Sequence, residues 1–214
     1  MVLALLMTLS SPVAARDFTV AELKPLAEEG SELAQAELGN MYAAGRGVPQ
    51  DYKEAMKWYR LAAEQGNAVA QSNLGIMYNN GDGVPQDFKE AVKWYRLAAE
   101  QGLANAQGTL AAMYKYGLGV SHDLKESVKW YRLAAEQGDA SSQRNLGVAA
   151  QLGGGVLQDD VMAHMWFNIA SANGDPIAGE LRDKRAGLMT TADISKAQAM
   201  ARECMSSGYT KCGY

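Results

Sequence analysis

The chain is poor in the side chains that build metal and redox sites: among its 214 residues there are only 2 Cys and 2 His. Two cysteines exclude a dense disulfide scaffold, and the Cys and His residues form no pattern that could build a structural zinc site. An excess of positive charge is also lacking, because the net charge is −4, whereas nucleic-acid-binding domains are typically basic. We therefore expect no metal, no cofactor and no nucleic-acid partner. A disordered chain is excluded as well, because 48% of the residues are hydrophobic.

The start of the chain lacks charge altogether. Residues 1–15 contain no charged side chain, and the apolar run at 2–9 is too short to span a bilayer, which takes about 20 apolar residues. Such a run followed by the small residues at 13–15 is typical of a signal peptide, cleaved here after Ala15. No Lys or Arg precedes the run, so either the free amino group replaces that charge or the natural start lies upstream. A packed or unstructured tail is the alternative. We expect a periplasmic or secreted protein without stable membrane insertion after cleavage.

A repeat of 36 residues dominates the rest of the sequence. The four tryptophans recur at this interval, and the string KWYRLAAEQG occurs three times unchanged. Aligning 31–66 with 67–102 without a gap gives 25 identities in 36 positions. The predicted divisions are a signal peptide at 1–15, an N-terminal partial repeat or cap helix at 16–30, repeats at 31–66, 67–102, 103–138 and a divergent 139–174, and C-terminal capping helices with a tail at 175–214.

Each unit is predicted to form two helices joined by a tight turn. In the first unit, apolar residues at helical spacing predict a helix over 32–44. The loop GRGVPQ at 45–50 ends it, because glycine adopts positive φ readily and Pro49 cannot continue a helix. Asp51, with Glu54 three residues later, predicts an N-cap of capping-box type and the start of the second helix. One helix pair cannot bury its own apolar face, so the units must stack. We predict an all-α fold, an α/α superhelical solenoid of helix-turn-helix repeats.

The repeat unit reads A-x-x-x-LG-x-MY-x-x-G-x-GV-x-x-D-x-x-x-A-x-x-WY-x-x-AA-x-x-G and covers about residues 31–174. This pattern resembles the Sel-1-like repeat (SLR), a relative of the tetratricopeptide repeat (TPR), and the resemblance implies a protein-interaction scaffold. Exported bacterial members resemble periplasmic regulators or factors that contact other cells. Some cysteine-rich relatives, with a disulfide in each repeat, are linked to β-lactam binding or hydrolysis. This chain lacks those cysteines and has no Ser-x-x-Lys motif.

Other motifs favour structural roles. The G-x-G turns lack the further residues of a phosphate-binding loop. Basic residues such as Lys57 recur on the second helix and could attract an acidic partner, but glutamates three or four residues away predict a charge-balanced surface instead. His122 and His164 have no convergent partner groups in the sequence, so we predict no catalytic residue and no enzyme activity.

Two cysteines, Cys204 and Cys212, lie close together near the C-terminus. In an oxidising compartment they could form a structural disulfide, a pairing that agrees with export. Two free thiols or a redox pair are the alternatives.

Differences among the four copies indicate where a partner would bind. Positions kept in every unit are explained by packing and turns, so the positions that vary along the first helix of each unit mark exposed surface. They are three or four residues apart and therefore share one helical face, which in an α-solenoid usually lines the concave groove. Their mixed character suits an uncharged peptide or helix; a merely tolerant surface is the alternative. The predicted groove residues are Glu37, Asn40, Asn73, Ile76, Asn80, Thr109, Ala112, Tyr116 and Asn145.

From these observations we predict a monomeric, non-catalytic protein-protein interaction scaffold. It would act as a periplasmic or secreted adaptor or regulator that binds a protein or peptide segment in its concave groove. The alternatives are a β-lactam-binding or hydrolysing envelope protein and a structural subunit of an envelope complex.

Overall fold

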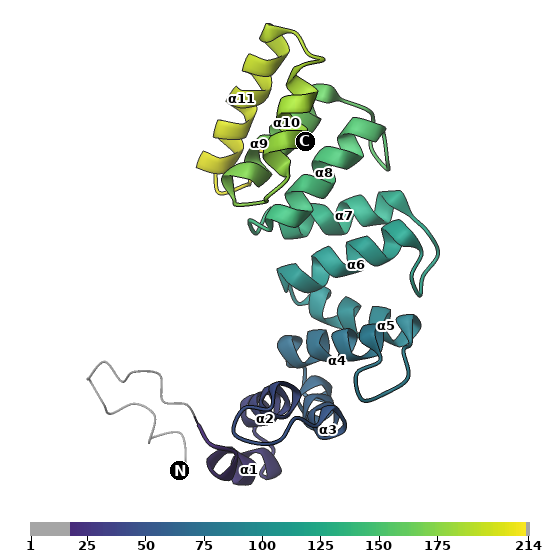
Figure 1. Cartoon of the computed structure of the whole chain (residues 1–214), viewed down its shortest axis with the longest axis vertical. Helices are drawn as coiled ribbons and strands as arrows, with labels where there is room; N and C mark the ends of the chain where they lie inside the picture. Colours follow the sequence, from purple (N-terminus) through teal and green to yellow (C-terminus); the bar gives the residue numbers. More distant parts are fainter. Residues whose placement is uncertain (1–17, 213–214) are drawn as a thin grey trace, which may run out of the picture.

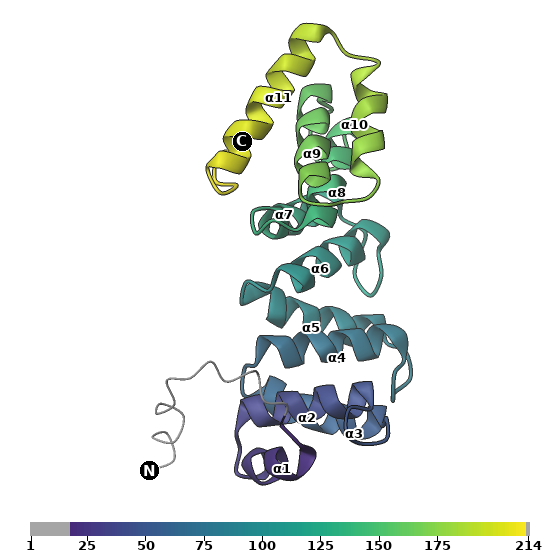
Figure 2. The same ribbon diagram turned by 60° about the vertical axis from the view of Figure 1, so that its left-hand side comes forward.

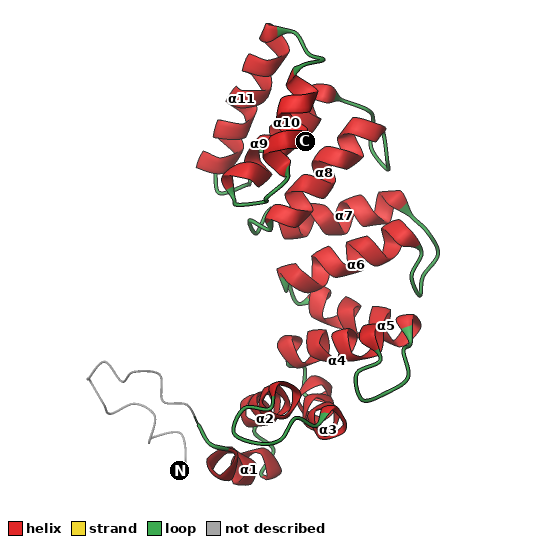
Figure 3. Cartoon of the chain, in the orientation of Figure 1, coloured by secondary structure: helices red, strands yellow, loops and turns green. Residues whose placement is uncertain are grey.

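The computed structural model describes residues 18–212, and within this range it contains eleven α-helices and no strand (Figures 1 and 3). The signal peptide predicted at 1–15 lies outside the described residues. The helices are α1 (Val20–Glu28), α2 (Glu32–Ala44), α3 (Tyr52–Glu64), α4 (Ala68–Asn80), α5 (Phe88–Glu100), α6 (Ala104–Tyr116), α7 (Leu124–Ala135), α8 (Ala140–Leu152), α9 (Asp160–Ala172), α10 (Ala178–Ala186) and α11 (Thr191–Ser206).

The helices stack in chain order as successive pairs. Helix α2 packs on α3, α4 on α5, α6 on α7 and α8 on α9, and each pair also packs on the next. Figures 1 and 2 show the pairs rising from α1 at one end of an elongated superhelix to α10 and α11 at the other. The predicted all-α solenoid is confirmed, and α2 has the bounds that the sequence predicts.

Aspartates start the second helix of each repeat. Asp51 Oδ1 accepts the backbone N–H groups of Lys53 and Glu54 at 2.9 and 3.0 Å, an N-cap of a kind that contributes about 1 kcal/mol. The predicted capping-box pairing of Glu54 is wrong. The Asp51 backbone N–H donates to the Tyr42 carbonyl at 2.9 Å, so no donor is left for Glu54, whose carboxylate accepts from Lys57 instead.

Glycines inside the first helices allow close approach of the second helices. A Cβ atom on Gly39 would lie 2.4 Å from a Tyr59 ring carbon, and one on Gly75 would lie 2.8 Å from the Tyr95 ring. Since these contacts are closer than any real Cβ atom tolerates, the aromatic ring takes the space that a side chain would need. Close packing of the second helix on the first therefore explains these glycines.

The tryptophans pack between repeats. Trp58 lies in the core that α2 shares with α1, and Trp94 packs against the core that α3 shares with α4. Trp166 is 1% exposed in the core closed by α11. These tryptophans therefore have a packing role.

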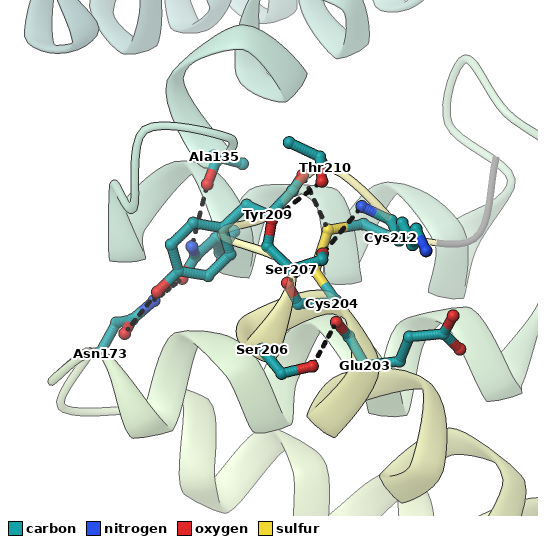
Figure 4. Close-up of a disulfide and its surroundings, with 11 residues drawn as sticks. Ala135, Asn173, Glu203, Cys204, Ser206, Ser207, Tyr209, Thr210 and Cys212 are labelled. Atoms are coloured by element: carbon teal, nitrogen blue, oxygen red, sulfur yellow. Dashed lines mark hydrogen bonds between the residues drawn. A yellow bond between two sulfur atoms is a disulfide. The ribbon is translucent and has the colours of Figure 1, made fainter.

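Two helices and a disulfide-closed loop cap the C-terminal end. Helix α10 begins at Ala178, where the Asp175 carboxylate accepts the backbone N–H groups of Ile177 and Ala178. Helix α11 packs on α9. Cys204 and Cys212 form a disulfide, and the loop between them directs Tyr209 towards Asn173, with the hydroxyl 3.0 Å from Asn173 Oδ1 (Figure 4).

Candidate interaction surface

The nine predicted groove residues lie on the first helices α2, α4, α6 and α8, and we call the surface that they form the groove face. Side chains on this face join neighbouring repeats directly. Asn73 Nδ2 donates to Asn40 Oδ1 at 3.2 Å, and Lys115 Nζ donates to Asn145 Oδ1 at 3.0 Å. These bonds link the groove face across the first two repeats and across the last two.

Large apolar side chains remain uncovered on the groove face. Tyr116 is 64% exposed and Ile76 is 40% exposed. The first helices α2, α4 and α8 also carry Leu33 at 70%, Val69 at 50% and Leu152 at 70%. Exposed apolar side chains that gather on one surface, with polar residues around them, are typical of binding surfaces.

Three of the predicted groove residues form hydrogen bonds to other residues of the chain. The Glu37 carboxylate pairs with Arg46 Nη2 at 2.7 Å and accepts from Asn40 Nδ2 at 2.9 Å. The Tyr59 hydroxyl donates to Asn40 Oδ1 at 2.8 Å, and this oxygen also accepts from Asn73. Glu37, Asn40 and Asn73 thus stabilise the junction between the first two repeats. The exposed Asn80 donates only to Asp82 in the adjoining turn.

A pocket of about 380 Å³ opens on the groove face between α6 and α8. It brings together three predicted residues, Thr109, Ala112 and Asn145. The hydroxyl-bearing side chains of Tyr131 and Ser142 are 5% and 1% exposed. Burial raises the pKa of Tyr131 above its usual 10.0, so its hydroxyl keeps the proton and can donate it. The pocket is lined by Asn105, Gly108, Thr109, Ala112, Tyr131, Asp139, Ser141, Ser142 and Asn145.

The second helices present a charge-balanced surface, as the sequence predicts. Lys57 Nζ donates to the Glu54 carboxylate at 2.6 Å, and this hydrogen bond raises the pKa of Lys57. Arg60 Nη2 donates to the Tyr78 hydroxyl at 2.8 Å. The Lys–Glu pair recurs as Lys93 with Glu90 and Lys129 with Glu126. Because Lys57, Lys93 and Lys129 are each paired with a glutamate, these three lysines offer little net attraction to an acidic partner.

No helix within residues 18–212 combines the length and apolar character needed to cross a membrane. In the same range no three or more His, Cys, Asp or Glu side chains gather as metal ligands would.

Comparison with known proteins identifies the repeat. The family described as Sel1 repeat matches residues 33–67, 68–103, 104–139 and 140–175. The chain belongs to the Sel1 repeat family. Members of this family generally mediate protein-protein interactions, and their scaffolds are typically non-catalytic.

Two solved Sel1 structures are similar to this chain. A protective antigen of uropathogenic Escherichia coli with the SLR fold is 38% identical to this chain, with a TM-score of 0.73. The match covers 92% of this chain and 47% of the antigen's chain. A Sel1 repeat protein of Oxalobacter formigenes is 35% identical, covers 77% and 48%, and has a TM-score of 0.71. The chain therefore spans about half the length of these two relatives. A comparison with curated proteins gave no match.

The structure of this Sel1 repeat array also shows a glutamine network that the sequence analysis missed. Gln71 Nε2 donates to the Ala63 carbonyl at the end of α3, at 3.1 Å, and Gln71 Oε1 accepts from Gln101 at 2.8 Å. The buried glutamine therefore joins the last turn of one Sel1 repeat to the end of the next. Equivalent glutamines, all at most 4% exposed, are Gln35, Gln107 and Gln143.

The pocket residues Gly108, Tyr131, Asp139 and Ser142 were also missed. A signal was present, because two of them depart from the repeat. Gly108 stands where the first two repeats have Ala36 and Ser72, and Ser142 replaces an alanine found in the three other repeats. Variation at positions expected to be buried therefore marks this site within the Sel1 array.

Proposed function

We propose that this Sel1 repeat protein is a non-catalytic scaffold, an adaptor or regulator, that binds a segment of a partner protein along its groove face. The observation that carries the proposal is the exposure of Ile76 and Tyr116 on a face whose neighbouring positions are also apolar and uncovered. Burying such side chains against a partner removes apolar surface from water, at roughly 25 cal/mol per Å². The pocket beside them supplies polar groups that would fix the orientation of a bound segment.

We also propose a periplasmic or secreted location. The leader-like composition of residues 1–15 supports it. The Cys204–Cys212 disulfide supports it too, since such bonds persist in oxidising compartments. The description of the uropathogenic relative as a protective antigen is in keeping with this location. Fractionation of cells that produce the full chain, with N-terminal sequencing of the product, tests it. A product in the cytosol that still carries its leader contradicts the proposal.

Site-specific photocrosslinking in the source cells tests the groove face. A photoreactive phenylalanine analogue replaces Tyr116 or Ile76, and in a control it replaces Leu157, which is 91% exposed in the turn before α9 and off the groove face. We expect one protein to crosslink from both groove positions but not from Leu157. Equal crosslinking from all three positions, or none from the groove face, contradicts the proposed function.

A further inference from the structure

The junction between the first two repeats holds a carboxamide belonging to the chain itself. Asn40 on α2 accepts a hydrogen bond from the Tyr59 hydroxyl at 2.8 Å and one from Asn73 Nδ2 at 3.2 Å. Its own Nδ2 donates to Glu37 at 2.9 Å. An amide group offers both an acceptor and donors, and at this junction both the oxygen and the N–H group of Asn40 form hydrogen bonds.

The junction between repeats three and four keeps the tyrosine and the second asparagine but lacks that carboxamide, and Thr109 stands at the position of Glu37. Tyr131 and Asn145 occupy the repeat positions of Tyr59 and Asn73, whereas Ala112 stands at the position of Asn40. The Tyr131 hydroxyl consequently forms no hydrogen bond to any side chain or backbone group within residues 18–212. The pocket of about 380 Å³ lies at this place.

Two further substitutions enlarge the pocket and add a polar group to it. Ser142 stands at the repeat position of Ala70, and its Oγ is buried without a hydrogen-bond partner among the described residues. Gly108 stands at the position of Ala36, and a Cβ there would come within 3.0 Å of Ser142 Oγ. The absence of a side chain at Gly108 therefore leaves the Ser142 hydroxyl facing the pocket. Buried polar groups in native proteins nearly always have a partner, so the buried Ser142 Oγ, beside a Tyr131 hydroxyl that forms no hydrogen bond within residues 18–212, points to a missing ligand.

We propose that this pocket binds the side-chain carboxamide of an asparagine or glutamine in the partner segment. The inference rests on the proposed function, because the carboxamide reaches the pocket from a chain lying on the groove face. Its oxygen takes the place of Asn40 Oδ1 and accepts the Tyr131 hydroxyl proton, while its N–H groups donate to Ser142 Oγ and to the Asp139 carboxylate. The Asp139 carboxylate also disfavours an acidic side chain, and an aliphatic one would leave both hydroxyls unpaired.

Capped amino acids provide defined probes. N-acetyl-asparagine methylamide and N-acetyl-glutamine methylamide are titrated into the isotope-labelled full chain, with the leucine and aspartate counterparts as controls, and backbone amide shifts are followed by NMR. We expect saturable shifts at Ala112, Ser142 and Asn145 from at least one amide probe, with an affinity at least tenfold above that of both controls. Equal affinity for the leucine probe, or no shift at these residues from either amide probe, overturns the proposal.

Two matched variants add the carboxamide to the junction that lacks it and remove it from the junction that has it. In Ala112→Asn the chain supplies its own carboxamide, as Asn40 does, so probe binding should fall at least tenfold and the midpoint of thermal unfolding should rise. Asn40→Ala removes the carboxamide from the first junction, and the probe should then shift signals around Tyr59 and Asn73 that do not respond in the wild type. Ala36 and Ala70 replace Gly108 and Ser142 there, so this binding should be weaker than at the Tyr131 pocket. Wild-type probe affinity in a folded Ala112→Asn variant overturns the proposal.

Failure of this inference can be told from failure of the proposed function. Partner crosslinking from Tyr116 that survives Ala112→Asn at full yield contradicts the pocket as the site of the partner's carboxamide and leaves the scaffold function standing. Amide-selective probe binding without any crosslinked partner contradicts the scaffold function, and the pocket then remains a site for a free carboxamide compound.

Discussion

Gln107 holds together two helices that belong to different repeats. Its Nε2 donates to the Ala99 carbonyl in the last turn of α5 at 3.1 Å, and its Oε1 accepts from Gln137 Nε2, just after α7, at 2.8 Å. The last carbonyls of a helix lack the usual partner four residues on, and the Ala99 carbonyl accepts from Gln107 as well as from the Gly102 backbone N–H at 3.0 Å. The same bonds recur at each junction, and at the C-terminal end Asn173 replaces the donor glutamine.

Replacing Gln107 by Leu should therefore destabilise the fold more than its modest change in size suggests. The variant removes two hydrogen bonds, the one to the Ala99 carbonyl and the one from Gln137, and each contributes about 0.5–1.5 kcal/mol. Urea unfolding followed by circular dichroism measures the loss. Gln137→Ala is the matched control, because the exposed Gln137 leaves a group that water can reach, and we expect a loss below about 1 kcal/mol. Equal stability of the two variants would argue against this role for Gln107.

The periodicity of the sequence predicts the helices and their stacking because it repeats without gaps and one pair cannot bury its own apolar face. The glutamine network could not be predicted in the same way, since Gln107 meets Ala99 only when one repeat stacks on the previous one. The predicted groove residues do lie on successive first helices. The sequence could not predict which of them are available to a partner. Asn40, for example, accepts a hydrogen bond from Tyr59, a residue 19 positions away on another helix.

Gly75→Ala should destabilise the protein although alanine is the better helix former. The new Cβ would lie 2.8 Å from the Tyr95 ring, and overpacking of this kind costs typically about 1–3 kcal/mol. Its matched control is Ala111→Gly at the equivalent position of the third repeat, where the structure already accommodates a Cβ. That change should cost about 1 kcal/mol through helix propensity. Thermal unfolding of both variants compares them, and a stabilised Gly75→Ala variant would contradict the packing argument.

Removing the disulfide should loosen the C-terminal cap selectively. The Cys204–Cys212 bond closes a loop that carries Tyr209 to Asn173, and closing so short a loop contributes roughly 2–3 kcal/mol in the chain-entropy model. The double variant Cys204→Ser with Cys212→Ser should be cleaved by protease near Tyr209 before the repeats are cut, and reductant should produce the same cleavage in the wild type. Tyr209→Phe, which removes only the hydroxyl, serves as control with a cost of about 1 kcal/mol. Simultaneous cleavage throughout the chain would show that the cap and the repeats open together.

His164 should make stability depend on pH at mildly acidic values. The residue is 2% exposed on α9 and its Nδ1 has no hydrogen-bond partner among the described residues. Burial, and then the nearby Arg182, lower its pKa below the usual 6.5, with Asp183 opposing them. Between the lowered pKa and 6.5 the unfolded chain binds a proton that the folded chain does not, so stability is complete above 6.5 and falls as the pH drops below it.

Urea unfolding of the wild type and of His164→Gln across this range measures the effect. The variant has no imidazole to protonate at this position, so the difference in unfolding free energy between the two proteins should shift in favour of the variant as the pH falls below 6.5. Comparing the difference removes the carboxylate titrations that both proteins share. His122→Gln is the control, since His122 is exposed in the turn before α7 and its removal should leave the pH dependence unchanged. A pH-independent difference between wild type and His164→Gln would show that the buried imidazole takes up its proton without cost to the fold.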